Sequence, residues 1–341
     1  MSGRESSAMT LRCHVSAGPV AGGGHLARCS AVAQCADAVG LTVEFSGDLD
    51  SAARAAVLRA GFGFAEGQAP PGHSVVLVDS YDPAVMDDAR IGQGDLVFSM
   101  DDHFGARPSG YTIDYHAADG SADLSGPDYA PLGPGLTALR TETHDGSDLL
   151  ISLGMGSAGI RDARRLADMI SAGQPHLEVI APVPDRPSTT HGSPGGPREA
   201  FWRRMAQSRG LVLGAGVSAY EAASLGRPLL LIQTADNQDV VAQAFTDLAP
   251  ALDLRGRFPT PHELAEAMEQ MWSAPIAESG PGLIDGFGAL RIRNAMLARL
   301  SGAGWPRVIR YRPARMQDRD YLFESRNEEG ARRASINARR V

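Results

Sequence analysis

The sequence predicts an α/β fold made of two parallel-sheet halves, and three observations lead to this prediction. Short apolar runs alternate with helical stretches along the chain, as in proteins whose helices pack on parallel strands. The alternation restarts after a polar, turn-prone stretch at 141–147. The chain has 341 residues, which is enough for two domains of about 150 residues each.

The predicted strands are short apolar runs that end in polar or turn-forming residues. They cover residues 11–16, 42–46, 74–79, 96–100, 149–153, 177–181, 210–213 and 228–233. The predicted domains are an N-terminal domain at 1–141, a C-terminal domain at 142–302 and a tail at 303–341, with a strand at 308–314 and a helix near 318–326. The tail is too short to bury its own core, so we expect it to dock, to pair with a second copy in a homodimer, or to stay partly disordered.

The composition is that of a soluble globular protein, with 43% hydrophobic residues, 21% charged residues and a net charge of −8. All 32 basic residues are arginines, and they form no basic stripe, which argues against a nucleic-acid partner. No apolar run approaches the roughly 20 residues of a membrane span. The N-terminal segment has no apolar signal core, so we expect a cytoplasmic protein.

The three cysteines, Cys13, Cys29 and Cys35, lie in predicted core elements. Their odd number does not suit a disulfide framework, and their spacing fits no zinc pattern. We therefore expect reduced packing residues and no metal site.

The first glycine-rich turn joins a predicted strand to a helix at 26–39, in the order Gly22, Gly23, Gly24, His25, with Arg28 three residues later. Free backbone N–H groups and the helix dipole favour an anion at such a junction. The same positive helix end disfavours an imidazolium, so His25 is expected to be neutral and able to accept a proton. The alternative is a glycine turn with a helix-capping histidine.

Similar turns follow strands in the second half. Small residues at a helix start let the backbone approach a diphosphate, which predicts phosphate binding by Gly214, Ala215, Gly216, Val217 and Ser218. Glu221, in the helix that follows, is placed to bind a ribose or only to interact with the helix dipole.

Two other strand ends are predicted to face the ligand. They carry Gly154, Gly156 and Ser157, and Asn237 and Gln238. Ordinary helix capping is the alternative for the strand end before Asn237.

Carboxylates also end two strands of the first half, Asp79 before Tyr81 and Asp101 before Asp102. They could position a nucleophile or hold a sugar hydroxyl, or they could cap turns. No glycine loop ends in Gly-Lys-Ser/Thr, which excludes a P-loop NTPase, and no GxGxxG follows the first strand, which argues against a dinucleotide oxidoreductase.

Taken together, the motifs resemble the nucleotide-sugar hydrolases of pseudaminic acid biosynthesis, which release UDP from a UDP-linked diacetamido-trideoxyhexose. Seven segments match in order and kind: GGGHLAR at 22–28, VVLVDSY at 75–81, MDD at 100–102, PLGPGLTALR at 131–140, GAGVSAYE at 214–221, ADNQ at 235–238 and IDGFGALRI at 284–292.

The resemblance implies a GT-B type fold, with two Rossmann-like domains facing across a cleft and the nucleotide held mainly by the C-terminal one. It implies chemistry without a metal or cofactor. His25 would activate a water that attacks the anomeric carbon with inversion while UDP leaves. Residues 214–218 would hold the diphosphate and Glu221 the ribose. Residues 237–238 would face the sugar or phosphate, with Asp79 and Tyr81 lining the wall opposite them.

Two segments depart from the family pattern. The turn at 154–158 reads GMGSA and lacks the family's aspartate, and an expected asparagine is replaced near DYH at 114–116. Both lie near the expected sugar position, which leaves a different sugar or acceptor open. The tail resembles the opening of a GNAT acetyltransferase but stops before any acetyl-CoA loop, so no acetyltransferase activity follows.

The leading hypothesis is a hydrolase that cleaves the glycosyl–phosphate bond of a nucleotide-activated amino or deoxy sugar. The alternative is a glycosyltransferase of the same fold, similar to the enzyme that adds N-acetylglucosamine to peptidoglycan lipid precursors, because water and an acceptor hydroxyl need the same base. A nucleotide-sugar sensor without catalysis is a third possibility.

Overall fold

The computed structural model describes residues 9–18, 23–65, 74–81, 96–102, 110–117, 120–141, 148–154, 157–181, 196–274, 284–304, 306 and 319. The chain divides into two compact units, residues 1–310 and 311–341. The predicted tail strand lies outside the described residues, as does nearly all of the predicted tail helix. No helix within the described ranges is long and apolar enough to cross a membrane.

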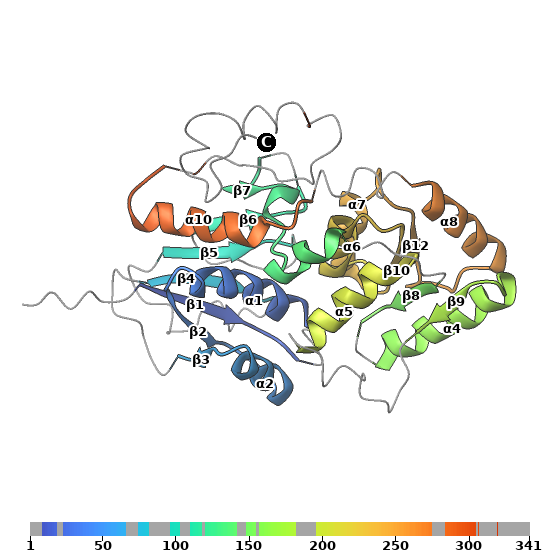
Figure 1. The fold of residues 1–341 in the computed structure, drawn as a ribbon, viewed down its shortest axis with the longest axis horizontal. Helices are drawn as coiled ribbons and strands as arrows, with labels where there is room; N and C mark the ends of the chain where they lie inside the picture. The colour runs from blue at the N-terminus through green and yellow to red at the C-terminus, as the bar shows by residue number, and fades with distance from the viewer. Residues whose placement is uncertain are drawn as a thin grey trace, which may run out of the picture. The chain divides into compact units, whose positions relative to one another are not determined.

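Seven parallel strands form the first sheet, in the order β3-β2-β1-β4-β5-β6-β7 (Figure 1). The chain winds outward from β1, which pairs with β2 on one side and β4 on the other. The elements are β1 (Thr10–Val15), α1 (Gly24–Asp37), β2 (Thr42–Ser46), α2 (Ser51–Arg59), β3 (Gly63–Phe64), β4 (Ser74–Asp79), β5 (Leu96–Met100), β6 (Tyr111–Asp114), β7 (Leu124–Ser125) and the 3-10 helices η1 (Pro127–Tyr129) and η2 (Pro134–Thr141).

Five parallel strands form the second sheet, in the order β12-β11-β10-β8-β9. Its central strand β10 pairs with β8 and β11. The elements are β8 (Asp148–Ser152), α4 (Ser157–Gly173), β9 (Glu178–Ile180), α5 (Gly196–Gln207), β10 (Gly210–Gly214), α6 (Val217–Leu225), β11 (Leu229–Gln233), η3 (Asp236–Gln238), α7 (Asp239–Ala244), β12 (Ala251–Asp253), α8 (Pro261–Ser273) and α10 (Gly288–Leu300).

Each of the eight predicted strands within the described ranges is present, three with the predicted bounds at 42–46, 74–79 and 96–100. The strands β3, β6, β7 and β12 are not predicted from the sequence, and they are only two to four residues long. Runs this short show no alternation or apolar stretch to separate them from loops. They are held by backbone pairing instead, β3, β7 and β12 as edge strands and β6 between β5 and β7.

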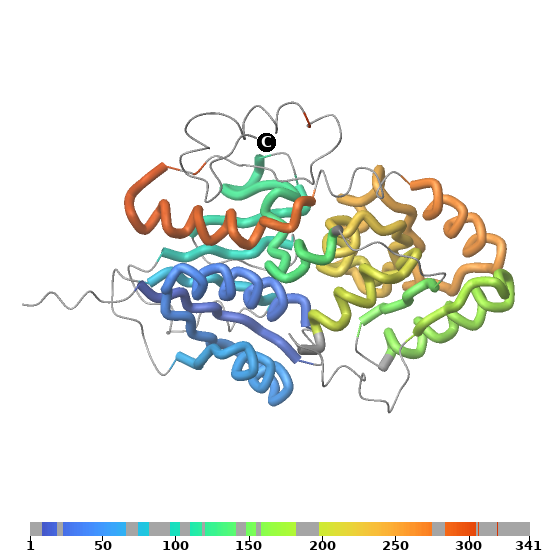
Figure 2. Tube along the Cα trace, in the orientation of Figure 1, coloured from blue at the N-terminus to red at the C-terminus, as the bar shows by residue number. Residues whose placement is uncertain are grey.

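The first hydrophobic core combines the first sheet with helices from both ends of the chain. Helices α1 and α10 pack against each other beside this sheet (Figure 2). Cys13 and Cys29 are free and fully buried in this core, and Cys35 is also free and buried, as predicted for packing residues. Helix α10 contributes Ala289, Ile292, Ala295 and Met296, so a segment predicted within the C-terminal domain completes the core of the first sheet.

Two cores cover the second sheet. One lies under α4 and α8 and includes Leu166 and Met268. The other lies under α5 and α6 and receives Leu132 and Leu136 from the segment that precedes β8. That segment approaches Trp202 so closely that a Cβ on Gly133 would stand 2.2 Å from its ring.

A buried ion pair fixes the start of α10. Arg291 donates to both carboxylate oxygens of Asp285, at 2.8 and 2.5 Å, and to the backbone carbonyl of Asp128 at 2.9 Å. Arg140 donates to the Asp285 carbonyl at 2.6 Å. Gly288 follows at the first turn of α10, where a Cβ would stand 2.0 Å from the Ala130 carbonyl oxygen. This close approach explains the second glycine of the IDGFGALRI motif.

Gly288→Ala is expected to lower the free energy of unfolding by about 1–3 kcal/mol or more, because the new methyl group meets backbone rather than a movable side chain. Urea unfolding followed by circular dichroism measures the change. Gly173→Ala is the matched control, since Gly173 is exposed near the end of α4 with nothing within 4 Å of its Cβ position. Equal stability of the two variants would contradict the packing described for α10.

Candidate active site

The carboxyl ends of three neighbouring strands bring acidic and aromatic side chains to one edge of the first sheet. Asp79 ends β4, Asp102 follows β5 by two residues, and His116 follows β6 by two. This is the edge at which open parallel sheets bind ligands. Helix α1 brings His25 and Arg28, which lie three residues apart and hence on one helix face, to the same place.

The Arg28 guanidinium holds these strand ends together. Its Nε and Nη2 donate to Asp79 at 2.8 and 2.6 Å. Its Nη1 donates to Asp102 and to the Tyr115 hydroxyl, at 2.6 and 2.7 Å. Arg28 is 5% exposed, and a buried cation is tolerated only when charges and hydrogen bonds compensate for lost hydration. We call this set, with His25, Tyr81 and His116, the polar network.

Asp79 and Asp102 are both held ionised by the network. Burial, the largest single effect, raises the pKa of each carboxyl. The positive charge of Arg28, together with the hydrogen bonds of His25 to Asp79 and of His116 to Asp102, outweighs it, so the pKa of Asp79 is lowered and that of Asp102 is lowered well below its usual value. Burial likewise opposes the charge on Arg28, and the two carboxylates overcome it and raise the pKa of the guanidinium.

His25 has its two ring nitrogens in different surroundings. Its Nδ1 lies 2.6 Å from Asp79 Oδ1 and 2.9 Å from Arg28 Nη2. Because ionised Asp79 only accepts and Arg28 only donates, and Nη2 already donates to Asp79 Oδ1, the arrangement is satisfied when Nδ1–H donates to Asp79. The lone pair then lies on Nε2, which makes no hydrogen bond with the part of the chain that the structure describes. This is the tautomer a general base needs.

Tyr81 packs against the base from the strand end that carries Asp79. Its ring meets that of His25 edge to face, with centroids 4.5 Å apart, and its hydroxyl donates to Asp102 Oδ2 at 2.5 Å. Burial and the Asp102 charge raise the pKa of Tyr81, against a smaller opposing effect of a hydrogen bond with Asn237. Two predicted site residues, Tyr81 and Asn237, thus lie near each other although they come from the two different sheets.

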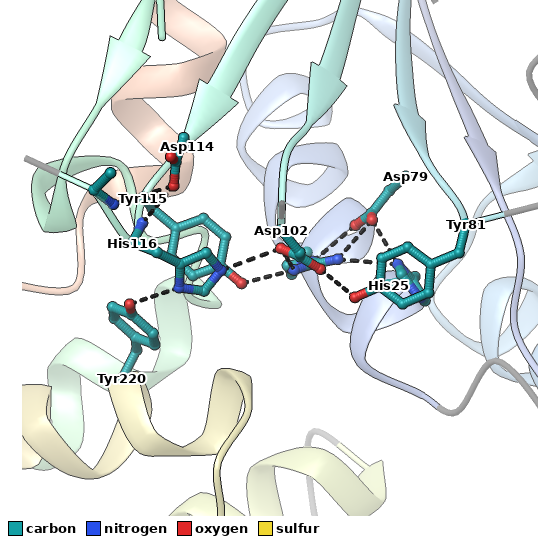
Figure 3. A network of polar contacts seen from close by, with 10 residues as sticks. His25, Asp79, Tyr81, Asp102, Asp114, Tyr115, His116 and Tyr220 are labelled. Atoms are coloured by element: carbon teal, nitrogen blue, oxygen red, sulfur yellow. Dashed lines mark hydrogen bonds and ion pairs between the residues drawn. The ribbon is translucent and has the colours of Figure 1, made fainter. Parts of the chain in front are cut away.

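His116 extends the network to helix α6. Its Nε2 lies 3.1 Å from Asp102 Oδ1 and its Nδ1 lies 2.7 Å from the Tyr220 hydroxyl, as the dashed lines of Figure 3 show. The Tyr220 ring packs edge to face against Tyr115 and Phe245. Tyr220, on the helix that follows the turn at 214–218, is therefore connected to the strand ends that meet the predicted base.

The predicted phosphate turn runs from the end of β10 into the start of α6. Gly216 precedes the helix, and nothing lies within 4 Å of its Cβ position. Gly23 and Gly24, at the start of α1, have the same open space. The first N–H groups of a helix lack partners within the helix, so both helix starts offer donors with room beside them. Gly22 lies outside the described residues.

Glu221 is buried and largely occupied. Its Oε1 accepts from Arg198 Nε and Nη2, at 3.1 and 2.5 Å, and from Trp202 Nε1 at 2.8 Å. Oε2 is buried and has no hydrogen-bond partner among the described residues. Leaving a carboxylate oxygen unpaired away from water is costly. Only Oε2 has capacity for the predicted ribose contact, which stays a prediction.

Of the remaining predicted residues, some have described surroundings and others lie outside the described residues. Gln238 Oε1 accepts from the backbone N–H groups of Thr234 and Ala235, at 2.6 and 3.3 Å, so its amide also shapes the turn after β11. Gly154 is exposed, with a φ of +96° that favours glycine. Gly156 and the side chain of Ser157 lie outside the described part.

The sequence places the segment 114–116 near the expected sugar position, but it indicates no role for His116, Tyr115 or Tyr220. The segment DYH at 114–116 follows a strand of only four residues, and the missed strand concealed a third strand end beside the other two. An aspartate closing each of three successive apolar runs was the available signal. Among the described residues, no group of three or more His, Cys, Asp and Glu side chains is arranged to hold a metal ion.

Sequence comparison finds one informative similarity. The chain is 27% identical over 196 residues to the spore coat polysaccharide biosynthesis protein SpsG of Bacillus subtilis (strain 168). The match covers 49% of this chain and 56% of SpsG, so it spans about half of each protein. No family model matches the chain.

Solved structures resemble nearly the whole chain at low sequence identity. The spinosyn rhamnosyltransferase SpnG is 14% identical with a TM-score of 0.59, and the match covers 86% of this chain and 100% of SpnG. The chain has a GT-B fold. A UDP-N-acetylglucosamine 2-epimerase shares it, at 11% identity and a TM-score of 0.54, over 89% of this chain and 99% of the epimerase. The two parallel sheets are its two Rossmann-like domains, and this part of the sequence prediction is confirmed.

Asp102→Asn is expected to weaken the pH dependence of the free energy of unfolding at acid pH. A carboxyl whose folded-state pKa is depressed contributes stability that is fully present above its unfolded pKa of about 4 and is lost as pH falls through the folded value. Urea unfolding of the natural protein should therefore show stability falling below about pH 4, and the variant should be less stable at pH 7 with a shallower fall. Asp247→Asn, at an exposed position, should keep the natural slope; an unchanged slope in Asp102→Asn would contradict the description of the network.

Proposed function

We propose that this protein is an enzyme that transfers a glycosyl group from a nucleotide-activated sugar to an acceptor hydroxyl, with His25 as the general base. The observation that carries the proposal is the orientation of His25, whose Nδ1 is engaged by Asp79 while Nε2 is left without a partner in the described residues. Buried Asp79 stabilises the imidazolium that forms when the base takes a proton.

In the proposed reaction, His25 Nε2 removes the proton of the acceptor hydroxyl as its oxygen attacks the anomeric carbon. The bond between that carbon and the phosphate oxygen breaks, and the electron pair leaves with the nucleoside diphosphate. The proton stays on His25, paired with Asp79. Attack opposite to the leaving group inverts the anomeric centre.

The developing charge on the diphosphate needs donors that are already in place. The proposal gives this role to the backbone at 214–218, where α6 begins and Gly216 leaves open space. Asn237, which lies near Tyr81, would contact the sugar or a phosphate. Glu221 Oε2, which lacks a partner in the described part of the chain, would accept a ribose hydroxyl.

Two kinds of similarity support a nucleotide-sugar reaction and favour transfer. SpsG is named for polysaccharide biosynthesis, and the fold is shared with SpnG, a rhamnosyltransferase whose structure with thymidine diphosphate has also been solved. The fold alone does not determine the reaction, and the carry-over from these proteins is part of the proposal.

Hydrolysis is the second candidate, and the seven ordered motifs between residues 22 and 292 favour it. The same base would act on water instead of an acceptor hydroxyl. The two reactions therefore differ in what occupies the space beside Nε2, not in the role of His25.

The decisive experiment incubates the protein with a panel of UDP- and TDP-sugars, first without and then with candidate acceptor sugars, and follows nucleotide release and the anomer formed by NMR. Release that needs an acceptor, with an inverted glycosidic product, supports transfer. Release of free inverted sugar without any acceptor supports hydrolysis. Binding of UDP or TDP without turnover of any donor contradicts both.

His25→Ala is expected to lower kcat by about 100- to 10,000-fold, the usual contribution of a general base. Asp79→Asn should also lower kcat strongly, because an amide can donate to Nδ1 and move the ring proton to Nε2. The control is His262→Ala, since the His262 side chain is 83% exposed on α8. Full activity of His25→Ala would show that another group is the base.

A further inference from the structure

One hydrogen bond joins the polar network of the first sheet to helix α6 through a pair of side chains that the proposed reaction does not use. His116 bonds to Asp102 through one ring nitrogen and to the Tyr220 hydroxyl through the other. Tyr220 is in the second turn of α6, four residues after Gly216. His116 can therefore affect the rate of the reaction through the position of α6, without touching the substrate.

The protons of this link can be assigned from its partners. Asp102 is ionised, since Arg28 keeps its pKa well below the usual value against burial, so it accepts from His116 Nε2–H. The pKa of Tyr220 is raised well above its usual value, mainly by burial, so its hydroxyl keeps its proton and donates to Nδ1. With Nε2–H donating to Asp102, Nδ1 accepts from the Tyr220 hydroxyl, so the two bonds of this link run in one direction, from Tyr220 through His116 to Asp102.

The chain of bonds runs without a break from the predicted base to the helix. His25 donates to Asp79, Arg28 bridges Asp79 and Asp102, and His116 connects Asp102 to Tyr220 (Figure 3). His116 is 9% exposed and Tyr220 is 2% exposed. In such buried surroundings a hydrogen-bonded chain keeps its geometry, because each unmade bond would leave a polar group without water.

We infer that His116 is a positioning residue, which through Tyr220 sets the placement of α6, and hence of the bound diphosphate, relative to His25. The inference rests on the proposed function and adds a residue to it. A glycosyl donor held at the start of α6 reacts only if its anomeric carbon lies within reach of the activated oxygen. An error of about 1 Å in such an alignment can cost 100-fold in rate.

The Tyr220 hydroxyl can be removed with little change in packing. Its ring is held by Tyr115 and Phe245 at centroid distances of 5.0 and 4.9 Å, and its only hydrogen bond in the described part of the chain is to His116. Tyr220→Phe therefore breaks the link and keeps the aromatic cluster. Tyr111→Phe is the matched control. Tyr111 begins β6, at the end of the strand away from the site, and its hydroxyl accepts hydrogen bonds from Arg299.

The test measures kcat and KM with the donor that the panel identifies, and the dissociation constant of UDP or TDP by calorimetry. Tyr220→Phe is expected to lower kcat by about 10- to 100-fold while the dissociation constant changes less than about 3-fold, because the nucleotide contacts are intact but misaligned. Tyr111→Phe should keep both constants at the natural values. His116→Phe should behave like Tyr220→Phe, and His116→Gln should recover much of the activity, since its amide can donate to Asp102 and accept from Tyr220.

An unchanged kcat in Tyr220→Phe overturns the inference and leaves the proposed function standing. So does a parallel loss of nucleotide binding and of melting temperature, which would show a purely structural role, and so does the absence of rescue in His116→Gln when it is as stable as the natural protein. A natural protein that turns over no donor overturns the proposed function and, with it, the inference.

Discussion

The buried guanidinium of Arg28 is the interaction on which the site depends. Without it, two carboxylates would stand at neighbouring strand ends in low dielectric, where like charges cannot both stay ionised. With it, both are held as anions, and each performs a separate task. Asp79 orients His25, and Asp102 holds Tyr81 and His116. A charge on the first turns of α1 therefore controls the alignment of side chains from three strands.

Most of the fold could be predicted because it depends on local pattern. The long apolar strands and the restart after residue 141 are visible in the sequence, and so are the glycine turns before α1 and α6. The pairing of His25 with Asp79 could be anticipated in part, since both were placed at a ligand-binding edge. The geometry adds the proton assignment, which depends on distances to Arg28 that no sequence spacing provides.

Other parts of the site depend on tertiary contacts between distant residues. His116 and Tyr220 are 104 positions apart, and the strand that carries the first is too short to be recognised. The glycine turn before Glu221 predicts either a ribose contact or an interaction with the helix dipole alone. In the structure one of the Glu221 oxygens is saturated by Arg198 and Trp202, a constraint that comes from the packing of α5 on α6 and not from the turn itself.

The position of helix α10 has a consequence for how the chain is made. Its Ala289, Ile292, Ala295 and Met296 fill the core of the first sheet, yet a ribosome adds them after every strand of both sheets. The first sheet therefore cannot finish its core until α10 has been synthesised, even though domains often fold in the order of their synthesis. The helices α4 to α8 beside the second sheet are all made before α10, so the sheet that is synthesised first waits for a helix that is synthesised after them.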